Sequence, residues 1–381
     1  MAYVAMARKW RPKSFDDLVG QEHIARTITN AIESGRLHHA FLFTGTRGVG
    51  KTTSARILAR TLNCTGEGKR PCGKCRACLE VDDGSSLDVI EMDGASNSGV
   101  DDVRAVIEQV KYAPMNRKYR VIVIDEVHML TKNAFNALLK TLEEPPPHII
   151  FIMATTEVNT VPQTILSRVL RFDFRRISPE NVAARLKHIC GQENIPADDD
   201  ALRAIAEKAD GSMRDALTYF DQVYAFRGDG TIDLESVHEA LGIPPEELFS
   251  ELAKSIAAHD AKGCVETVVR FHRKGIEIPD FLEGLLRHLR NLLLASIGDM
   301  PAEEIGVSPE ALRELREQAV PFTTGDLLRL ARIALDLRQE VRWSADPRVT
   351  VEIGLLRMAH LASTRSIRKL LEAQTEKKTE P

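Results

Sequence analysis

Residues 40–53 read AFLFTGTRGVGKTT, an apolar run that leads directly into a glycine-rich loop. Short apolar runs of this kind, here residues 40–45, predict a strand buried on both faces. The loop at 45–53 matches G-x-x-x-x-G-K-[ST] in full, with a predicted strand before it and a predicted helix after it. In this structural context the motif binds the phosphates of a nucleotide.

Phosphate binding explains each residue type in this loop. Glycines let backbone N–H groups close around phosphate oxygens, Lys51 reaches the β- and γ-phosphates, and the Thr52 hydroxyl can bind Mg²⁺. A chance glycine turn is the alternative, and the flanking strand and helix disfavour it. The loop residues that we predict to contact the nucleotide are Gly45, Thr46, Gly48, Val49, Gly50, Lys51, Thr52 and Thr53.

Three further apolar runs predict strands that are buried on both faces. They are residues 87–92, 121–126 and 149–156. Between the last two, residues 135–142 carry phenylalanine and leucine at the spacing of one helical face. This helix must end before Pro145, which begins a run of three prolines. Strands that alternate with helices predict a parallel α/β module.

The run VIVIDE, 121–126, ends in two carboxylates, which is costly unless they meet a cation or solvent at the strand tip. Asp125 fits a contact to Mg²⁺, and Glu126 fits the group that orients or deprotonates an attacking water. The pair therefore indicates hydrolysis. We interpret His128 as a packed or capping side chain. Thr155 or Thr156, at the end of the next strand, can place a hydroxyl near the γ-phosphate, although threonine is common in strands.

Strand patterns end near residue 177 and helical patterns follow. Ser178-Pro179-Glu180 combines an N-cap, a proline at the first helical position and an acid in the first turn. The segment LGIPPEE, 241–247, marks a second boundary. We predict an α/β domain at 1–177, helical domains at 178–243 and 244–370, and a polar tail at 371–381.

The net charge and the distribution of apolar residues exclude several classes of function. The 381 residues carry a formal net charge of −4 and a pI of about 6.3, so no global basic field attracts nucleic acid or an anionic membrane. The sequence does not open with an apolar signal-peptide core, and it contains no run of about eighteen apolar residues. We expect a cytoplasmic protein with reduced thiols and no membrane contact.

Four of the six cysteines lie within one short segment, at Cys64, Cys72, Cys75 and Cys78. The spacing C-x₇-C-x₂-C-x₂-C in a reducing compartment fits a closed tetrahedral Zn²⁺ site better than disulfides, and a closed site is structural. An iron–sulfur cluster is the chemical alternative. The remaining two cysteines, Cys190 and Cys264, are typical of small hydrophobic side chains in helices.

Two arginines stay ambiguous when they are judged from the residues alone. Arg168 follows a predicted helix end and is in itself an ordinary surface arginine. Arg214 lies in the first turn of a helix that Ser212 begins, where a cation opposes the helix dipole. This unfavourable placement is a mild indication of an external anionic partner.

Together these motifs resemble the gamma/tau subunits of bacterial DNA polymerase III clamp loaders, a family of AAA+ ATPases. Besides the phosphate loop, the resemblance is carried by VIVIDEVHML, FNALLKTLEEPPPH, ATTE, ILSR, GSMRDAL and ARKWRPKSFDDLVGQEH. It runs from about residue 7 to 243, and the C-terminal helices match in character and position. The implied fold is an AAA+ module with a parallel sheet and a zinc-binding insertion at 64–78, then an all-α lid and an all-α collar. The length matches the short form of the family or a truncated long form.

The resemblance implies further residue roles. By position, Thr156 is the first sensor, Arg214 the lid sensor, and Arg168 the arginine finger that reaches the ATP of the next subunit. The family usually has Ser-Arg-Cys where this chain has Val169 after the arginine, and valine fills the same apolar role. The residues implied beneath the adenine are Ala7, Arg11 and Val19. The residues implied to contact DNA phosphates are Arg104, Lys140 and Thr164.

The implied activity is ATP-driven loading of a sliding clamp. Further copies of this chain and subunits of the delta and delta-prime type form a ring, ATP binding holds the clamp open, and primed DNA triggers the hydrolysis that releases it. The catalytic residues are then Lys51, Glu126 and, in trans, Arg168. ATP and Mg²⁺ serve the reaction, and Zn²⁺ is structural.

Two other functions compete with this one. A structural loader subunit that no longer hydrolyses ATP has no need of Lys51, the Asp125-Glu126 pair or Arg214. In a zinc-bearing DNA-repair ATPase the zinc module usually precedes the ATPase core, whereas here it interrupts the core. Sequence-specific zinc-finger binding is disfavoured as well, because no recognition helix of the usual length separates paired ligands.

Overall fold

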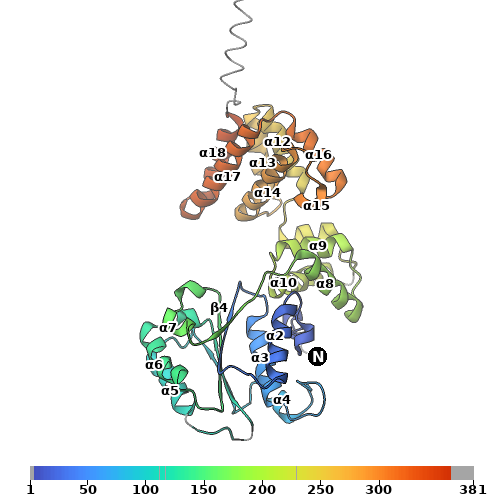
Figure 1. The fold of residues 1–381 in the computed structure, drawn as a ribbon. Coiled ribbons are helices and arrows are strands. Elements are labelled where there is room, and N and C mark those ends of the chain that lie inside the picture. The colour runs from blue at the N-terminus through green and yellow to red at the C-terminus, as the bar shows by residue number, and fades with distance from the viewer. Residues whose placement is uncertain (1–3, 111, 116, 229, 362–381) are drawn as a thin grey trace, which may run out of the picture. The chain divides into compact units, whose positions relative to one another are not determined.

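The computed structural model describes residues 4–110, 112–115, 117–228 and 230–361 (Figure 1). The chain divides into two compact units, Met1–Ser236 and Val237–Pro381. The polar tail predicted at 371–381 lies outside the described residues. The domain boundaries predicted after residues 177 and 243 stay predictions.

A five-stranded parallel sheet is the centre of the first unit. Its strands are β1 Ala40–Thr44, β2 Val89–Asp93, β3 Arg120–Asp125, β4 Ile149–Thr155 and β5 Leu170–Asp173. Their order across the sheet is β2-β3-β4-β1-β5, and every pair is parallel. The three middle strands are buried along their length, apart from the half-buried Asp125 at the tip of β3. The predicted parallel α/β module is therefore confirmed.

The two edge strands depart from the prediction. β2 is expected to be buried on both faces, yet within the strand only Met92 is buried. β5 is not predicted at all, because its four residues are largely exposed and only Phe172 packs into the core. An edge strand has a neighbour on one side only, so its sequence need not be apolar.

Helices cover both faces of the sheet (Figure 1). On one face, α2 Glu22–Glu33 and α3 Lys51–Asn63 pack against Phe41 and Phe43 of β1. On the other face, α6 Lys132–Glu143 packs against Leu42 of β1, together with α5 Val100–Val110 and α7 Gln163–Leu166. The side chains of successive strand residues thus pack against the helices on opposite faces of the sheet. The helix predicted over 135–142 is confirmed and ends, as expected, before the prolines.

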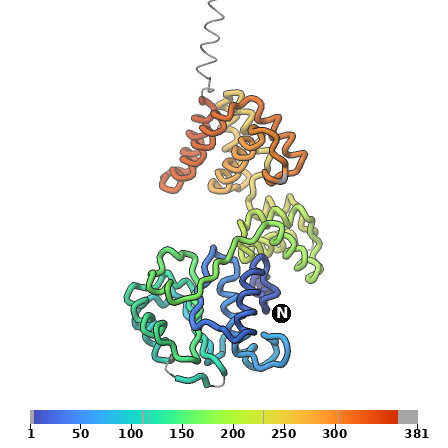
Figure 2. Tube along the Cα trace, in the orientation of Figure 1, coloured from blue at the N-terminus to red at the C-terminus, as the bar shows by residue number. Residues whose placement is uncertain are grey.

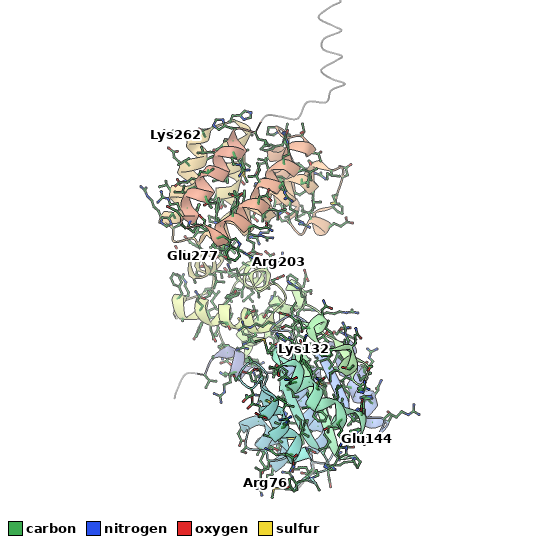
Figure 3. The ribbon with its side chains drawn as sticks, turned by 90° about the vertical axis from the view of Figure 1, so that its left-hand side faces the viewer. Arg76, Lys132, Glu144, Arg203, Lys262 and Glu277 are labelled. Carbon is green, nitrogen blue, oxygen red and sulfur yellow. The ribbon has the colours of Figure 1, made fainter. Side chains whose placement is uncertain are left out.

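The other elements of the first unit flank this core. The helices are α1 Met6–Lys9, α4 Arg76–Asp83, α8 Pro179–Glu193, α9 Asp199–Lys208 and α10 Met213–Arg227, and the 3₁₀ turns are η1 Phe15–Asp17, η2 Val127–Met129 and η3 Val158–Thr160. α8 begins as predicted, because Ser178 Oγ accepts a hydrogen bond from the Asn181 N–H at 3.3 Å. Arg76, at the start of α4, points into solvent (Figure 3). α11 Leu234–Leu241 spans the division between the units.

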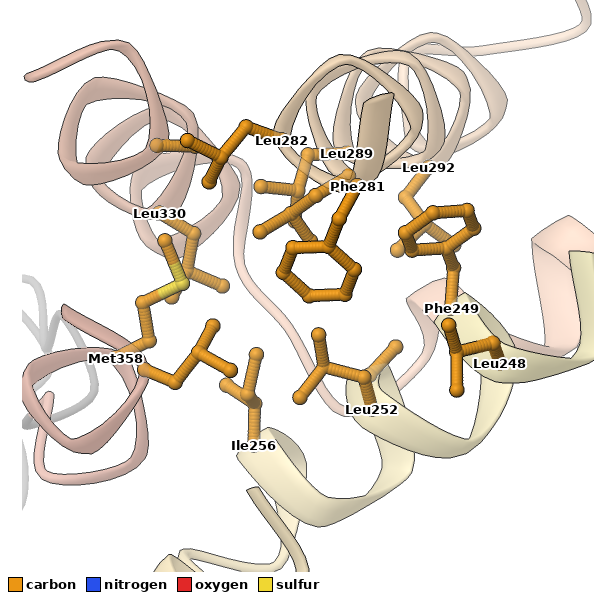
Figure 4. Close-up of a cluster of buried hydrophobic side chains, with 14 of the residues drawn as sticks. Leu248, Phe249, Leu252, Ile256, Phe281, Leu282, Leu289, Leu292, Leu330 and Met358 are labelled. Atoms are coloured by element: carbon orange, nitrogen blue, oxygen red, sulfur yellow. The ribbon is translucent and has the colours of Figure 1, made fainter. Parts of the chain in front are cut away.

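The second unit is entirely helical in its described part. Its helices are α12 Glu246–Ala257, α13 Ala261–Arg273, α14 Ile278–Ser296, α15 Ala302–Ile305, α16 Pro309–Ala319, α17 Thr324–Trp343 and α18 Pro347–Ala359. Phe281 lies at the centre of its hydrophobic core (Figure 4). The Phe281 ring stacks on that of Phe271, with centroids 4.2 Å apart. Across both units, no helix of the described residues is long and apolar enough to cross a bilayer.

Replacing Phe281 with alanine removes a fully buried ring from this core. The lost apolar burial and the cavity left behind should lower the free energy of unfolding of the unit by about 3–5 kcal/mol. Urea denaturation followed by circular dichroism measures this change. Leu328, 55% exposed in the same unit, provides the control, since Leu328→Ala should change stability by about 0.5 kcal/mol at most. Equal effects of the two substitutions would contradict the core described above.

Candidate functional site

The loop between β1 and α3 has a backbone that glycine adopts most readily. Gly45, Gly48 and Gly50 have φ angles of 144°, 79° and 102°. A Cβ on Gly45 would lie 2.6 Å from the carbonyl oxygen of Phe174, and one on Gly48 would lie 1.8 Å from Ser212 Oγ, just before α10. Backbone conformation and close packing both therefore require glycine here.

Lys51, the first residue of α3, has its side chain folded back into this loop and is only 5% exposed. Its Nζ donates to the carbonyl oxygens of Gly45 and Thr46, at 2.9 Å each. Burial lowers the pKa of Lys51, and the nearby carboxylates of Glu126 and Asp125 oppose that shift. A poorly solvated ammonium attracts an anionic group more strongly than one in bulk water.

The acidic end of β3 faces the same loop. Thr52 Oγ1 donates to Asp125 Oδ2 at 2.7 Å, so the hydroxyl and the carboxylate that the sequence assigns to one Mg²⁺ lie side by side. Glu126, the next residue, has a left-handed backbone with φ of 46°. Such a conformation is costly for a non-glycine residue and is concentrated at functional sites.

The end of β4 holds the Glu126 side chain. Thr156 Oγ1 donates to Glu126 Oε2 at 3.3 Å, and His128 Nδ1 lies 3.4 Å from the same oxygen. Thr155 is buried, and its hydroxyl is hydrogen-bonded to His128 Nδ1 at 3.1 Å. Of the two threonines that the sequence leaves open, Thr156 is thus the one that contacts Glu126 directly.

These groups surround a cavity of about 880 Å³, a volume typical of small-molecule sites, which span about 300–1,000 Å³. The predicted residues that line it are Ala7, Arg11, Val19, Gly48, Val49, Gly50, Lys51, Thr52, Thr53, Asp125, Glu126 and Arg214. Gly45 and Thr46 do not line it, but their carbonyl oxygens accept hydrogen bonds from Lys51, and Thr156 is hydrogen-bonded to Glu126. The structure therefore brings together the phosphate loop, the acidic pair, the N-terminal segment and the start of α10.

Several arginines around the cavity are missed by the sequence analysis. They are Arg8, Arg47, Arg56, Arg60 and Arg185. Burial lowers the pKa of Arg11, and the positive charge of Arg56 lowers it further. The negative charge of Glu91 opposes this lowering, whereas the charges of Arg214 and Arg8 add to it. Clustered cations suit a polyphosphate ligand. No local sequence pattern predicts that these arginines lie together, because they come from four separate segments of a chain with a net negative charge.

Arg168 is not among the residues that line this cavity. It follows α7, where its guanidinium donates to the carbonyl oxygen of Thr164 at 2.7 Å and to Glu143 Oε1 at 2.6 Å. Val169, the departure from the family's usual cysteine, packs partly buried against the core beneath α6 and α7. Contacts within this chain therefore hold the arginine at the surface, outside the cavity.

The three residues assigned to DNA contacts are exposed and lie on helices that cover one face of the sheet. Arg104 is on α5, Lys140 on α6 and Thr164 on α7. Arg104 is paired with Asp101 at 3.1 Å in a solvent-exposed ion pair. None of the three lines the cavity.

The four clustered cysteines form a candidate metal site. All six cysteines of the chain are free thiols, and the four Sγ atoms of the cluster lie within 4.8 Å of one another. Four thiolates around one ion, with bonds of about 2.3 Å, lie about 3.8 Å apart. A Cβ on Gly66 would lie 2.6 Å from Cys72 Sγ, so a glycine is needed for the loop to close around the sulfurs. The arrangement fits a tetrahedral ion with a closed shell of ligands.

Hydrogen bonds favour the thiolate at two of the four clustered cysteines, whereas burial raises the pKa of Cys78. Burial disfavours the thiolate of Cys75, but bonds from the backbone of Cys78 and Thr65 outweigh it and lower the pKa of Cys75 to about 5. Hydrogen bonds from the backbone of Lys74 and Cys75 lower the pKa of Cys72 as well. In the two isolated cysteines burial raises the pKa to about 11, as expected for small buried side chains in helices.

Three family models match consecutive parts of the chain, from residue 20 to residue 373. The family described as DNA polymerase III, delta subunit, matches residues 20–178. The clamp loader subunit ATPase lid domain matches 181–230, and gamma and tau domain III matches 232–373. Among solved structures, the RuvB Holliday junction branch migration motor of Thermotoga maritima aligns with 82% of this chain and 90% of that chain at 20% identity, with a TM-score of 0.47.

Individual relatives agree with these matches. The chain is 41% identical to DNA polymerase III subunit tau of Salmonella typhimurium, over 94% of this chain and 55% of that protein. It is 40% identical to subunit tau of Bacillus subtilis, over 94% of this chain and 63% of that protein, so it spans little more than half of these relatives. Subunit gamma of Buchnera aphidicola is 38% identical and is covered over 99% of its length. The chain therefore belongs to the gamma/tau subunit family of DNA polymerase III, as its motifs predict.

Proposed function

We propose that this chain is an ATP-hydrolysing subunit of a replicative clamp loader and that it works in the cytoplasm. The observation that carries the proposal is the cavity where Lys51, Asp125 and Glu126 of the sheet module meet Arg214 of the following helices. A site built from two parts of one chain is suited to convert the state of the nucleotide into a movement of one part against the other.

Within this site each side chain has a separate task. Lys51 and the loop N–H groups bind the phosphates of ATP, and Thr52 and Asp125 would hold Mg²⁺, which neutralises charge that develops on the phosphates. Glu126 orients or deprotonates the attacking water, and Thr156 and His128 fix its carboxylate. Arg214 contacts the phosphates from the lid, and Ala7, Arg11 and Val19 line the adenine end.

Arg168 acts in the site of a neighbouring subunit. Its place outside its own cavity supports this role, because a trans-acting arginine must reach across an interface. Further copies of the chain, with partners of the delta and delta-prime type, would form a ring that holds the sliding clamp open when ATP is bound. Primed DNA then aligns Arg168 with the neighbour's ATP, and hydrolysis releases the clamp on the DNA.

Contacts to DNA are made with phosphates, which suits a loader that acts at any sequence. Arg104, Lys140 and Thr164 are the residues we assign to this surface, and their exposure supports the assignment. The four-cysteine site holds Zn²⁺, which the all-thiolate ligand set favours over harder cations. Its closed shell supports a structural and not a catalytic ion.

The competing functions lack this support. A non-hydrolysing subunit does not require a strained Glu126 held by two neighbours, or a threonine hydroxyl bonded to Asp125. A DNA-repair ATPase of the zinc-bearing type does not require the lid and gamma/tau domain III that the chain matches.

The test of the proposed function is ATP hydrolysis by the chain assembled with delta-type and delta-prime-type subunits, with and without clamp and primed DNA. An arginine finger contributes about 10³–10⁵ in rate in other phosphoryl-transfer systems, so Arg168→Ala should abolish the stimulation by primed DNA while ATP still binds. Arg171→Ala is the matched control, because Arg171 is an exposed arginine three residues away that is ion-paired with Asp173 of its own strand. Hydrolysis that ignores both primed DNA and Arg168 would refute the proposal.

Zinc content gives a second prediction. The wild-type chain should carry one zinc ion by elemental analysis, Cys75→Ser should lose it, and Cys190→Ser should keep it, since Cys190 is buried in α8 and does not belong to the four-cysteine cluster. The loss of a thiolate ligand should also lower the melting temperature, because structural zinc contributes directly to folding. Iron and visible absorbance in the purified protein would instead identify an iron–sulfur cluster.

A further inference from the structure

The N-terminal segment, residues 5–19, forms one wall of the cavity, and we call it the strap. Nine of its residues besides Ala7 line the cavity: Ala5, Arg8, Trp10, Arg11, Pro12, Lys13, Asp17, Leu18 and Val19. In Figure 2 the dark-blue start of the chain lies between the green helices α8–α10 and the light-blue cysteine loop. The strap has little regular structure of its own, a single short helix and a 3₁₀ turn, so its position depends on what holds it.

One end of the strap is bound to the helices that follow the sheet module. The backbone N–H of Met6 donates to Asp221 Oδ2 at 2.8 Å, and Trp10 Nε1 donates to Glu193 Oε1 at 2.9 Å. The guanidinium of Arg185 lies over the Trp10 ring, 5.7 Å from its centroid. These contacts involve α8 and α10, the part of the first unit that also supplies Arg214.

The other end of the strap is bound by Arg60, near the end of α3. Arg60 is only 2% exposed, and its guanidinium donates both to the carbonyl oxygen of Lys13 and to Asp82 Oδ1. A buried guanidinium is tolerated only when it is paired, so Asp82 is what allows Arg60 to hold the strap backbone. A second link runs in parallel, an ion pair between Lys69 of the cysteine loop and Asp16.

Asp82 belongs to the cysteine module, residues 64–84. It lies on α4, one turn after Cys78 and on the same face. Eight residues are too few to form a stable helix alone, so α4 depends on what fixes its ends. Cys75 is the N-cap of α4 and Cys78 lies in its first turn, and both are ligands of the candidate metal site.

We propose that the cysteine module holds the strap over the nucleotide through Asp82 and Arg60, so that metal bound in the module sets the affinity of the chain for nucleotide. This proposal rests on the proposed nucleotide site. It gives the module a role beyond its own folding, and it makes Asp82 and Arg60 positioning residues for the adenine end of the cavity.

Neutralising Asp82 distinguishes its role in holding the strap from the direct repulsion between its charge and an anionic nucleotide. Asp82→Asn removes a negative charge beside the cavity, which by Coulomb attraction alone would strengthen binding of an anionic nucleotide. The proposal predicts the opposite sign, because an unpaired Arg60 releases Lys13 and with it the strap. Asp83→Asn is the matched control: it removes the same charge one residue away, from a carboxylate whose bonds are to Ser85 in its own turn.

The experiment uses the full chain with Trp343→Phe. The sequence has two tryptophans, and Trp343 is 92% exposed in the other unit, so Trp10 then reports the strap alone. ADP affinity is measured by calorimetry in magnesium buffer, Trp10 exposure by emission and acrylamide quenching, and zinc by elemental analysis. Each variant is measured as purified and after zinc is removed by chelation.

Asp82→Asn should keep its zinc and bind ADP about tenfold more weakly, because Arg60 loses its partner and no longer fixes Lys13. Trp10 emission should change, because Trp10 lies three residues before the released Lys13, although Glu193 still bonds its indole. Asp83→Asn should stay within about twofold of wild type, and Asp82→Glu should restore part of the affinity. Zinc removal should weaken wild type by a similar factor and add little to Asp82→Asn, because both act through one linkage.

Unchanged ADP affinity and Trp10 emission in zinc-bearing Asp82→Asn would overturn the proposal. The proposal would also be overturned if zinc removal weakened ADP binding by the same factor in wild type and in Asp82→Asn. The metal would then act on the site by a route that does not include Asp82. If the wild-type chain binds no ADP at all, the proposed nucleotide site itself fails. That outcome differs from one in which the wild-type chain binds ADP and the Asp82→Asn substitution leaves the affinity unchanged.

Discussion

The parallel pairing of β1, β3 and β4 is the constraint on which the site depends. Thr44 at the end of β1 lies opposite Thr155 at the end of β4, and Ile124, just before Asp125 in β3, lies opposite Met153 of β4. Because the carboxyl ends of parallel strands meet at one edge, the phosphate loop, the acidic pair and the threonine of β4 converge there without any sequence proximity. The burial of the middle strands fixes that register, since a slip by one residue would turn every side chain to the wrong layer.

The sequence is most informative where one side chain or backbone group has to satisfy a strict local requirement. The loop needs glycine at positions of positive φ, and the buried strands need apolar side chains on both faces, so both are visible in the residues. The caps at Ser178 and Ser212 are equally local. Weaker requirements leave weaker patterns, which explains why β5 is missed and β2 is expected to be more buried than it is.

The candidate site also includes groups that no local pattern identifies. Arg60 is a helical residue like many others in sequence, and only the fold places Lys13 and Asp82, 47 and 22 residues away along the chain, on its guanidinium. The same holds for Arg56 and Arg185, which reach the cavity from different elements. Family resemblance, and not spacing, suggests the roles of Arg168, Arg214 and the three residues assigned to DNA contacts, and those roles stay predictions.

The ion pair between Arg168 and Glu143 determines how readily this arginine can change partners. Both side chains are partly exposed, 32% and 50%, and pairs of this kind contribute about 0–1 kcal/mol. Glu143 therefore keeps the guanidinium ordered near the subunit surface but binds it too weakly to retain it against a phosphate. In the ring that we propose, each interface would start from an arginine already ordered at the surface. The reversibility of its contact with Glu143, more than the strength of that contact, would let the same subunits pass through many cycles.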